Sequence, residues 1–131
     1  MVIDEAAACP CGSGSAFGAC CGPVIGGERP ARSAEELMRS RYSAFAVGEA
    51  GHLLASWAQE TRPRRLVLDG GERWLRLRVL GASHAPGSDT ALVEFVAVSE
   101  RAGVRSRLHE LSRFVRRGGR WFYLDGGIDP S

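Results

Sequence analysis

Residues 105–125 read RSRLHELSRFVRRGGRWFYLD, and apolar and polar residues alternate on both sides of Gly118 and Gly119. Alternation of this kind is typical of a strand with one covered face, and a glycine pair between two such runs is typical of a tight turn. If the two glycines form a two-residue turn, Arg117 pairs with Arg120, and this pair sets the register of both strands. The stretch therefore predicts an antiparallel hairpin.

This register predicts which side chains share a face of the hairpin. One face carries aromatic, hydroxyl and charged side chains, namely Glu110, Ser112, Phe114, Arg116, Trp121, Tyr123 and Asp125. The opposite face carries His109, Leu111, Arg113, Val115, Phe122 and Leu124. The first face suits the wall of a partly polar cavity, although a solvated face with cross-strand pairs has the same composition. A slip of one residue in the turn would exchange the two faces.

The segments before the hairpin complete the expected domain. Four runs with a period of two predict strands near residues 73–81, 90–99, 105–116 and 120–125, separated by short turns. Ser33 and Glu36 form a capping box and Gly48 is a natural stop, so a helix is expected between them. A second, shorter helix is expected near residues 49–58. Helices followed by strands indicate an α+β domain whose helices pack on one face of a curved antiparallel sheet.

All four cysteines of the 131-residue chain lie close together near its start, at Cys9, Cys11, Cys20 and Cys21. A disulfide between the adjacent Cys20 and Cys21 would be strained, and the chain lacks the C-x-x-C spacing of a redox dithiol. Four thiolates suit a closed tetrahedral metal site, and the glycines between them allow the turns that such a site needs. We therefore expect a structural zinc ion. Iron, thiols without a metal, and crossed disulfides in an oxidising compartment are the alternatives.

The composition excludes few functions. The net charge is +2, and all 17 basic residues are arginine, a bias that codon usage in a GC-rich genome explains.

Residues 6–27 carry no charge, but they are too rich in Gly, Pro, Ser and Cys for a spanning helix and lack the basic start of a secretory signal. We therefore expect no membrane association and a cytoplasmic location, where thiols stay reduced.

Residues 105–120 contain six arginines and one acidic residue. Arginines interleaved with aromatic rings can bind the phosphates and bases of nucleic acid. Arginines on exposed strands also keep a sheet soluble and protect its edges. Nucleic acid is therefore a partner that we consider but do not favour.

The cysteine-containing stretch CPCGSGSAFGACCG, residues 9–22, resembles the SEC-C motif, the zinc-binding tail of the bacterial translocation motor SecA. The resemblance implies that Cys9, Cys11, Cys20 and Cys21 are the zinc ligands. The last ligand of the motif in SecA is usually histidine, and Cys21 takes that position here. The segment between the ligand pairs is typically rich in lysine, whereas residues 15–19 of this chain carry no charge. The resemblance therefore extends to the metal but not to the partners of SecA, which are SecB and the ribosome.

Several other stretches, among them LMRSRYSAF (37–45), HELSRF (109–114) and WFYLDG (121–126), resemble the YchJ family. That family joins a SEC-C motif to a domain of the nuclear-transport-factor-2-like (NTF2-like), or cystatin-like, fold. The resemblance implies a zinc knuckle in residues 1–23, a linker in residues 24–33 and the α+β domain in residues 34–131. Domains of this fold often contain a cone-shaped pocket, and their sheets commonly pair into homodimers. The family has no established biochemical activity.

We assign to the expected pocket the residues Arg39, Tyr42, Trp57, Glu110, Ser112, Arg113, Tyr123 and Asp125. Arg39 and Arg41 lie about 200° apart on the expected helix, so at most one of them faces the sheet. A buried arginine at this place would need a carboxylate partner such as Glu94, Glu110 or Asp125.

We expect the protein to act as an interaction or adaptor module, in which the zinc knuckle displays a docking surface for a protein partner. The first alternative is a small-molecule-binding or catalytic pocket of isomerase or hydrolase type, with His109, Glu110 or Asp125 as acid or base and Tyr123 as a hydrogen-bond donor. No nucleophile–base signature occurs in the sequence, so binding is expected rather than catalysis. The second alternative is a nucleic-acid or ribosome-associated binder.

Overall fold

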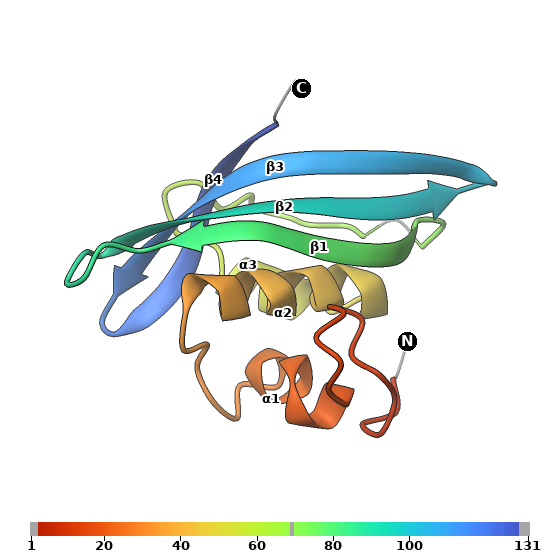
Figure 1. Ribbon diagram of the computed structural model, residues 1–131, viewed down its shortest axis with the longest axis horizontal. Helices are drawn as coiled ribbons and strands as arrows, with labels where there is room; N and C mark the ends of the chain where they lie inside the picture. The colour runs from red at the N-terminus through yellow and green to blue at the C-terminus, as the bar shows by residue number, and fades with distance from the viewer. Residues whose placement is uncertain (1–2, 69, 129–131) are drawn as a thin grey trace.

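The computed structural model describes residues 3–68 and 70–128. A four-stranded sheet lies over the helices (Figure 1). Most of the cysteine-containing segment lies on the other side of the helices, but its loop at Gly12 approaches the Leu77 carbonyl of the sheet. The expected start of the knuckle at residue 1 and the expected end of the domain at residue 131 fall outside the described residues.

The sheet is an antiparallel meander with the strand order β1-β2-β3-β4. Its strands are β1 (Arg73–Ser83), β2 (Thr90–Arg101), β3 (Val104–Arg117) and β4 (Arg120–Ile128). Gly118 and Gly119 have positive φ angles of 58° and 78°, and Arg117 pairs with Arg120 across the turn that they form. The α+β class and the antiparallel meander are therefore confirmed, and each strand extends beyond its expected end.

Helix α2 (Ala34–Val47) begins and ends where the capping residues indicate. The Ser33 hydroxyl accepts a hydrogen bond from the Glu36 amide at 3.1 Å, and Gly48 ends the helix in the left-handed conformation with a φ of 84°. The Glu36 carboxylate accepts the amide of Arg32, at 2.7 Å, rather than the amide of Ser33. The carboxylate thus caps the chain one residue further from the helix than a capping box does.

Helix α3 (Ala50–Ala55) is shorter than expected because the chain after it joins the sheet. The Ala58 amide donates to the Tyr123 carbonyl at 2.7 Å, and the Tyr123 amide donates to the Ser56 carbonyl at 2.8 Å. These two bonds form a short parallel bridge that holds Trp57 beside Tyr123 of β4. The bridge therefore fixes the chain after α3 to strand β4.

Helix α2 is covered on two sides. One side packs on the sheet, and the other contacts helix α1 (Cys21–Ile25), which follows the short 3-10 helix η1 (Phe17–Ala19). A single hydrophobic core includes buried residues from all three layers, such as Cys11, Leu37 and Val93. The cysteine-containing segment is therefore packed against the domain.

The expected linker at residues 24–33 contributes to this packing. Its first two residues belong to α1, and Val24 is buried. Arg29 forms two hydrogen bonds with the Glu36 carboxylate, at 2.7 and 3.0 Å. The segment is therefore fixed to the first turn of α2.

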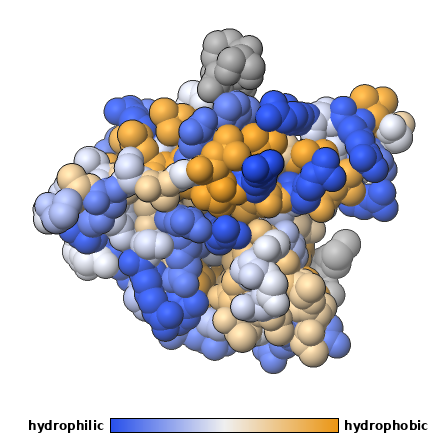
Figure 2. Space-filling view, in the orientation of Figure 1, coloured by the Kyte–Doolittle hydropathy of each residue, from blue (hydrophilic) through white to orange (hydrophobic). Residues whose placement is uncertain are grey.

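No helix of the described residues covers the outer face of the sheet (Figure 1). Hydrophobic and strongly hydrophilic surface alternate over the strands in this view (Figure 2). Leu80, Leu92 and Leu111 are exposed, and the arginines of β1 and β3 lie among them. Within the described part of the chain, no helix has both the length and the apolar character that crossing a bilayer requires.

Candidate functional site

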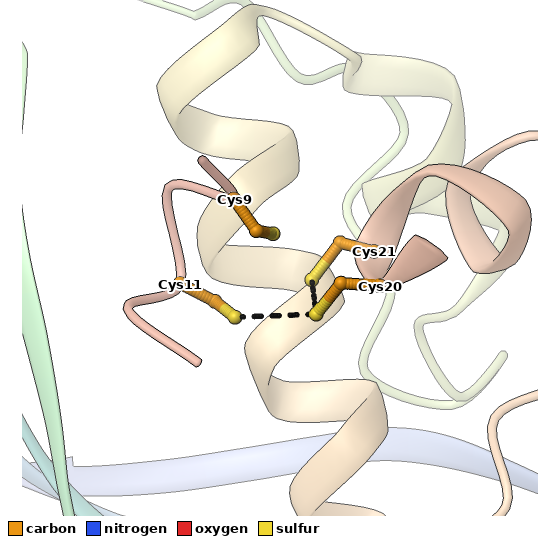
Figure 3. A group of neighbouring side chains, drawn as sticks. All are labelled: Cys9, Cys11, Cys20 and Cys21. Carbon is orange, nitrogen blue, oxygen red and sulfur yellow. Dashed lines mark hydrogen bonds between the residues drawn. The ribbon is translucent and has the colours of Figure 1, made fainter. Parts of the chain in front are cut away.

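The four cysteine sulfur atoms converge on one point (Figure 3). Cys9 and Cys11 come from the loop before η1, and Cys20 and Cys21 lie at the start of α1. All four Sγ atoms lie within 4.8 Å of one another, with 3.6 Å between Cys11 and Cys20 and 4.0 Å between Cys20 and Cys21. Four sulfurs bound to a tetrahedral zinc ion at about 2.3 Å would lie about 3.8 Å apart. The donor set and its spacing therefore fit a metal ion held by four thiolates.

Glycines allow the chain to bring the sulfurs together. Gly12 and Gly14 have positive φ angles of 78° and 89°, a conformation that costs little only for glycine. Gly22 follows the second cysteine pair, and a Cβ atom at this position would lie 2.8 Å from the Phe17 carbonyl oxygen. The backbone of η1 therefore leaves no room for a side chain at residue 22.

The surroundings of the sulfurs favour negative charge on Cys11 but oppose it on Cys20 and Cys21. The Ser13 hydroxyl lies 3.1 Å from the sulfur of Cys20, and the Ser43 hydroxyl of α2 lies 3.6 Å from the sulfur of Cys9. Hydrogen bonds from Cys21 and Cys9 lower the pKa of the Cys11 thiol. Burial raises the pKa of Cys20, and hydrogen bonds with Cys11 and Cys9 raise the pKa of Cys21. A cation among the sulfurs would favour the thiolate form of both, because metal binding requires deprotonated thiols.

Arg39 attaches the cysteine loop to α2. Its Nη1 atom donates to the Cys11 carbonyl at 3.0 Å, while its Nε atom donates to the Glu35 carboxylate at 3.0 Å. On the same side of the helix, Arg29 reaches the Cys20 carbonyl at 3.5 Å. Arg39 was expected to line the pocket, but it lies on the opposite side of α2, because the cysteine segment covers that side.

A cavity of about 230 Å³ lies between α2, the sheet and the residues after α3. Most of its wall is aromatic or aliphatic, including Phe45, Trp74, Phe95 and Phe114. Its charged lining residues are Arg41 and Glu110, and Ser112 lines it beside Glu110. A partly open cavity with an apolar wall and a few converging polar groups is typical of a small-molecule site.

Five of the eight predicted pocket residues line this cavity, namely Tyr42, Trp57, Glu110, Ser112 and Tyr123. Arg113 and Asp125 lie on the exposed surface, where they form an ion pair with distances of 2.5 and 2.6 Å. The expected register holds as far as the Phe114–Tyr123 pair, and a bulge then shifts it by one residue. Arg113 therefore pairs with Asp125, and both side chains point away from the cavity.

Arg41 is the arginine that faces the cavity, and its side chain is buried, with 6% of the residue exposed. Its Nη1 atom donates to the Leu53 carbonyl at 2.8 Å and to the Ser56 hydroxyl at 2.7 Å. Its guanidinium lies over the rings of Trp57 and Tyr123, at 4.9 and 4.5 Å from their centres. Burial lowers the pKa of Arg41 to about 10, so the side chain remains charged at neutral pH.

The carboxylate partner that was expected for a buried arginine is not in contact with Arg41. Within residues 3–68 and 70–128, no carboxylate lies within 4.0 Å of this guanidinium. Two neutral acceptors and two ring faces take the place of that partner. Sequence reasoning gave Arg41 as the alternative to Arg39, but helical periodicity alone cannot show which side of a helix meets the sheet.

Most arginines between residues 105 and 120 have acidic partners in the folded chain. Ion pairs join Arg105 to Glu100, Arg113 to Asp125, Arg116 to Asp89, and Arg117 to Glu60. Since four of the six arginines are paired, the local excess of positive charge is smaller than the sequence of this stretch indicates. The pairing is typical of a solvated sheet surface.

Comparison with known proteins gives two matches that together span most of the chain. Residues 33–126 match a family described as "YchJ, middle NTF2-like domain", and residues 7–23 match the SEC-C motif. A UPF0225 protein of Methylibium petroleiphilum is 54% identical over 123 residues, which are 93% of this chain and 89% of that protein. A UPF0225 protein of Streptomyces coelicolor is 45% identical over 118 residues, or 90% of this chain and 93% of that protein.

Two solved structures are similar along almost the whole chain. The solution structure of a SEC-C motif-containing protein from Rhodopseudomonas palustris has 36% identity and a TM-score of 0.83, and the match covers 94% of this chain and 99% of that one. The crystal structure of a SEC-C motif-containing protein from Psychrobacter arcticus has 24% identity and a TM-score of 0.79, and the match covers 97% of this chain and 85% of that one. The second likeness is evidence of fold alone.

The contact between Gly22 and Phe17 gives a first prediction. Gly22→Ala places a methyl group against the Phe17 carbonyl and should lower the free energy of unfolding by about 1–3 kcal/mol, the usual cost of overpacking. Urea denaturation measures the change. As a control, Gly51→Ala in α3 meets no atom within 4 Å and should leave stability equal or up to about 1 kcal/mol higher. Equal effects of the two substitutions would contradict the prediction.

Proposed function

The chain belongs to the YchJ family, with a SEC-C motif at residues 7–23 and an NTF2-like domain at residues 33–126, and we propose that it is a zinc-stabilised protein that binds a small molecule. The proposed binding site is the cavity between α2 and the sheet. One observation carries this proposal: a buried guanidinium and a carboxylate open into a cavity with aromatic walls. Ligand binding needs no nucleophile, and the sequence contains no nucleophile–base signature, so a binding role fits this arrangement.

Zinc is the metal that best fits the donor set. Soft thiolate ligands select Zn²⁺, Cu(I) or iron–sulfur clusters, and a compact set of four sulfurs suits a single tetrahedral ion. Four protein ligands leave no open position for water, so the ion would have a structural role. Because the thiols must stay reduced to bind it, we place the protein in the cytoplasm. There the ion would hold the loop of Cys9 and Cys11 to the start of α1, against α2.

Metal analysis of protein purified under reducing, metal-replete conditions tests this part of the proposal. We expect a zinc-to-protein ratio near one, and a ratio near zero for a Cys20→Ser, Cys21→Ser variant. Zinc at 1,000 times its dissociation constant stabilises a protein by about 4 kcal/mol, and the variant should lose a stabilisation of that order. Ser106→Ala, on the exposed surface of β3, is the control and should keep both metal and stability. A ratio near zero in the unaltered protein would refute the zinc site.

The volume of the cavity supports a small ligand. An apolar cavity of about 150 Å³ is enough to bind benzene, and this one has a volume of about 230 Å³. The lining residues Phe45, Trp74 and Glu110 are themselves partly exposed, which gives a ligand access from solvent. We expect a simple aromatic probe to enter between these side chains.

Indole and phenol are suitable probes, and NMR chemical shifts of the zinc-loaded protein measure their binding. Saturable changes should be confined to residues that line the cavity. Ala97→Phe, at a buried position of the lining, should fill the space and reduce binding at least tenfold. Ala82→Phe, at an exposed position of β1, is the matched control and should leave binding unchanged. Binding that is equally strong in both variants would place the probe elsewhere and refute the proposed site.

An adaptor role for the knuckle is the second candidate. Gly12, Ser13, Gly14 and Ser15 are exposed although the neighbouring cysteines are buried. The surface of the cysteine-containing segment shows weakly polar to weakly hydrophobic colours, without the deep blue of charged groups (Figure 2). This exposed, uncharged loop favours contact with a protein rather than with an anionic polymer.

A charge placed on this loop tests the adaptor role. Ser15→Arg adds a positive charge to the loop and leaves the zinc ligands in place. A protein partner that docks on the knuckle should bind this variant at least tenfold more weakly, while the zinc content stays unchanged. Unchanged affinity for an isolated partner would exclude docking through this loop.

A further inference from the structure

The cavity contains one cation and one carboxylate that form no ion pair with each other. Arg41 extends from α2 and Glu110 extends from β3, and both side chains line the same space. Among the described residues, neither side chain forms a salt bridge. A buried charge is costly unless it is paired, so Arg41, with 6% of the residue exposed, favours an anionic partner inside the cavity. Glu110 is partly exposed at the same cavity, where it can accept a cationic partner.

One edge of the Arg41 guanidinium is available for such a partner. Its Nη1 atom is occupied by the Leu53 carbonyl and the Ser56 hydroxyl. The hydrogen bonds of Arg41 among the described residues all come from Nη1, so the other edge, formed by Nε and Nη2, is left for a partner in the cavity that Arg41 lines. The rings of Trp57 and Tyr123 fix the plane of the group. Two parallel N–H groups on one edge of an arginine match the two oxygens of a carboxylate.

The Glu110 carboxylate accepts one hydrogen bond and lies over a glycine of β4. The Ser112 hydroxyl donates a hydrogen bond to Oε2 of Glu110. The same oxygen would lie 2.3 Å from a Cβ atom at residue 126, so the absence of a side chain at Gly126 makes room for it. The remaining lone pairs of the carboxylate are available to a donor in the cavity.

The two charges together restrict the ligand. A simple organic acid would pair with Arg41, but it would leave Glu110 without a cation and would bring a second negative charge near it. A simple amine would leave Arg41 unpaired. A ligand that carries both a carboxylate and a protonated amine satisfies both groups, and the aromatic wall can accept an apolar side chain. The cavity volume of about 230 Å³ lies below the range of about 300–1,000 Å³ for sites of drug-sized ligands, so the ligand should be smaller than a drug-sized molecule.

We propose that the cavity binds a small zwitterion, an apolar α-amino acid, with its carboxylate on the Nε–Nη2 edge of Arg41 and its ammonium group on Glu110. The apolar side chain of the ligand packs against Phe45, Trp74 and Phe95. This inference rests on the proposed ligand-binding function and adds the chemical class of the ligand.

Titration calorimetry of the zinc-loaded full chain with matched probes tests the inference. L-Phenylalanine carries both charges, 3-phenylpropionate lacks the amine, and 2-phenylethylamine lacks the carboxylate. We expect L-phenylalanine or L-leucine to bind at least tenfold more tightly than either analogue, because each analogue leaves one charge of the cavity unpaired. NMR shifts at the cavity residues establish that the binding occurs there.

Two variants assign the contacts. Arg41→Gln should remove the advantage of L-phenylalanine over 2-phenylethylamine, and Glu110→Gln should remove its advantage over 3-phenylpropionate. Glu110→Gln keeps the size of the side chain and a hydrogen bond to Ser112, so it remains informative if the Arg41 variant folds poorly. Arg113→Gln is the control, because this guanidinium is paired with Asp125 on the outer surface, and all affinities should stay unchanged.

The outcomes separate this inference from the proposed function. If 3-phenylpropionate or 2-phenylethylamine binds in the cavity as tightly as L-phenylalanine, the zwitterion is refuted and the cavity remains a binding site. Unchanged affinity for L-phenylalanine in both the Arg41 and Glu110 variants also overturns the inference. If none of these probes, nor indole, changes the NMR shifts of the cavity residues, both the ligand class and the proposed function are refuted.

Discussion

Helix α2 packs against the sheet on one side and against the cysteine segment on the other, and the rest of the structure depends on these two contacts. The sheet covers one side of the helix and the cysteine segment covers the other (Figure 1). Arg39 and Arg41 are two residues apart and therefore point to opposite sides. Arg39 holds the backbone of Cys11, and Arg41 extends into the cavity. The cysteine cluster and the cavity thus lie on opposite sides of the same helix.

Because α2 lies between them, the short cysteine-containing segment and the α+β domain share one hydrophobic core. A ring of about fourteen residues cannot form a core of its own, and a metal ion usually supplies the energy that orders it. Here the cysteine segment also contributes buried side chains to the common core, among them Phe17 and Cys21. The position of α2 therefore depends on contacts from both layers. A contact that moves α2 on the cysteine side would also move Arg41.

The sequence predicts the local features of the fold well and the long-range ones less well. Gly118 and Gly119 determine a turn between neighbouring segments, so the hairpin and its first pairs follow from the pattern alone. The bulge at Leu124 has no local signal, because the alternation of side chains continues through it. The choice between Arg39 and Arg41 depends on where the cysteine segment packs, which is a contact between residues 28 positions apart. The convergence of the four cysteines was predictable because all of them lie within thirteen residues.

The bulge in β4 also determines the electrostatics of the cavity. One extra residue, Leu124, rotates Asp125 to the outer surface and brings Gly126 opposite Ser112. In the uninterrupted register Asp125 would lie opposite Ser112, beside Glu110, and the cavity would hold two acidic groups against one guanidinium. With the extra residue the acidic and basic groups of the cavity balance one to one. The bulge thus leaves the lining of the cavity with one positive and one negative side chain and no net charge.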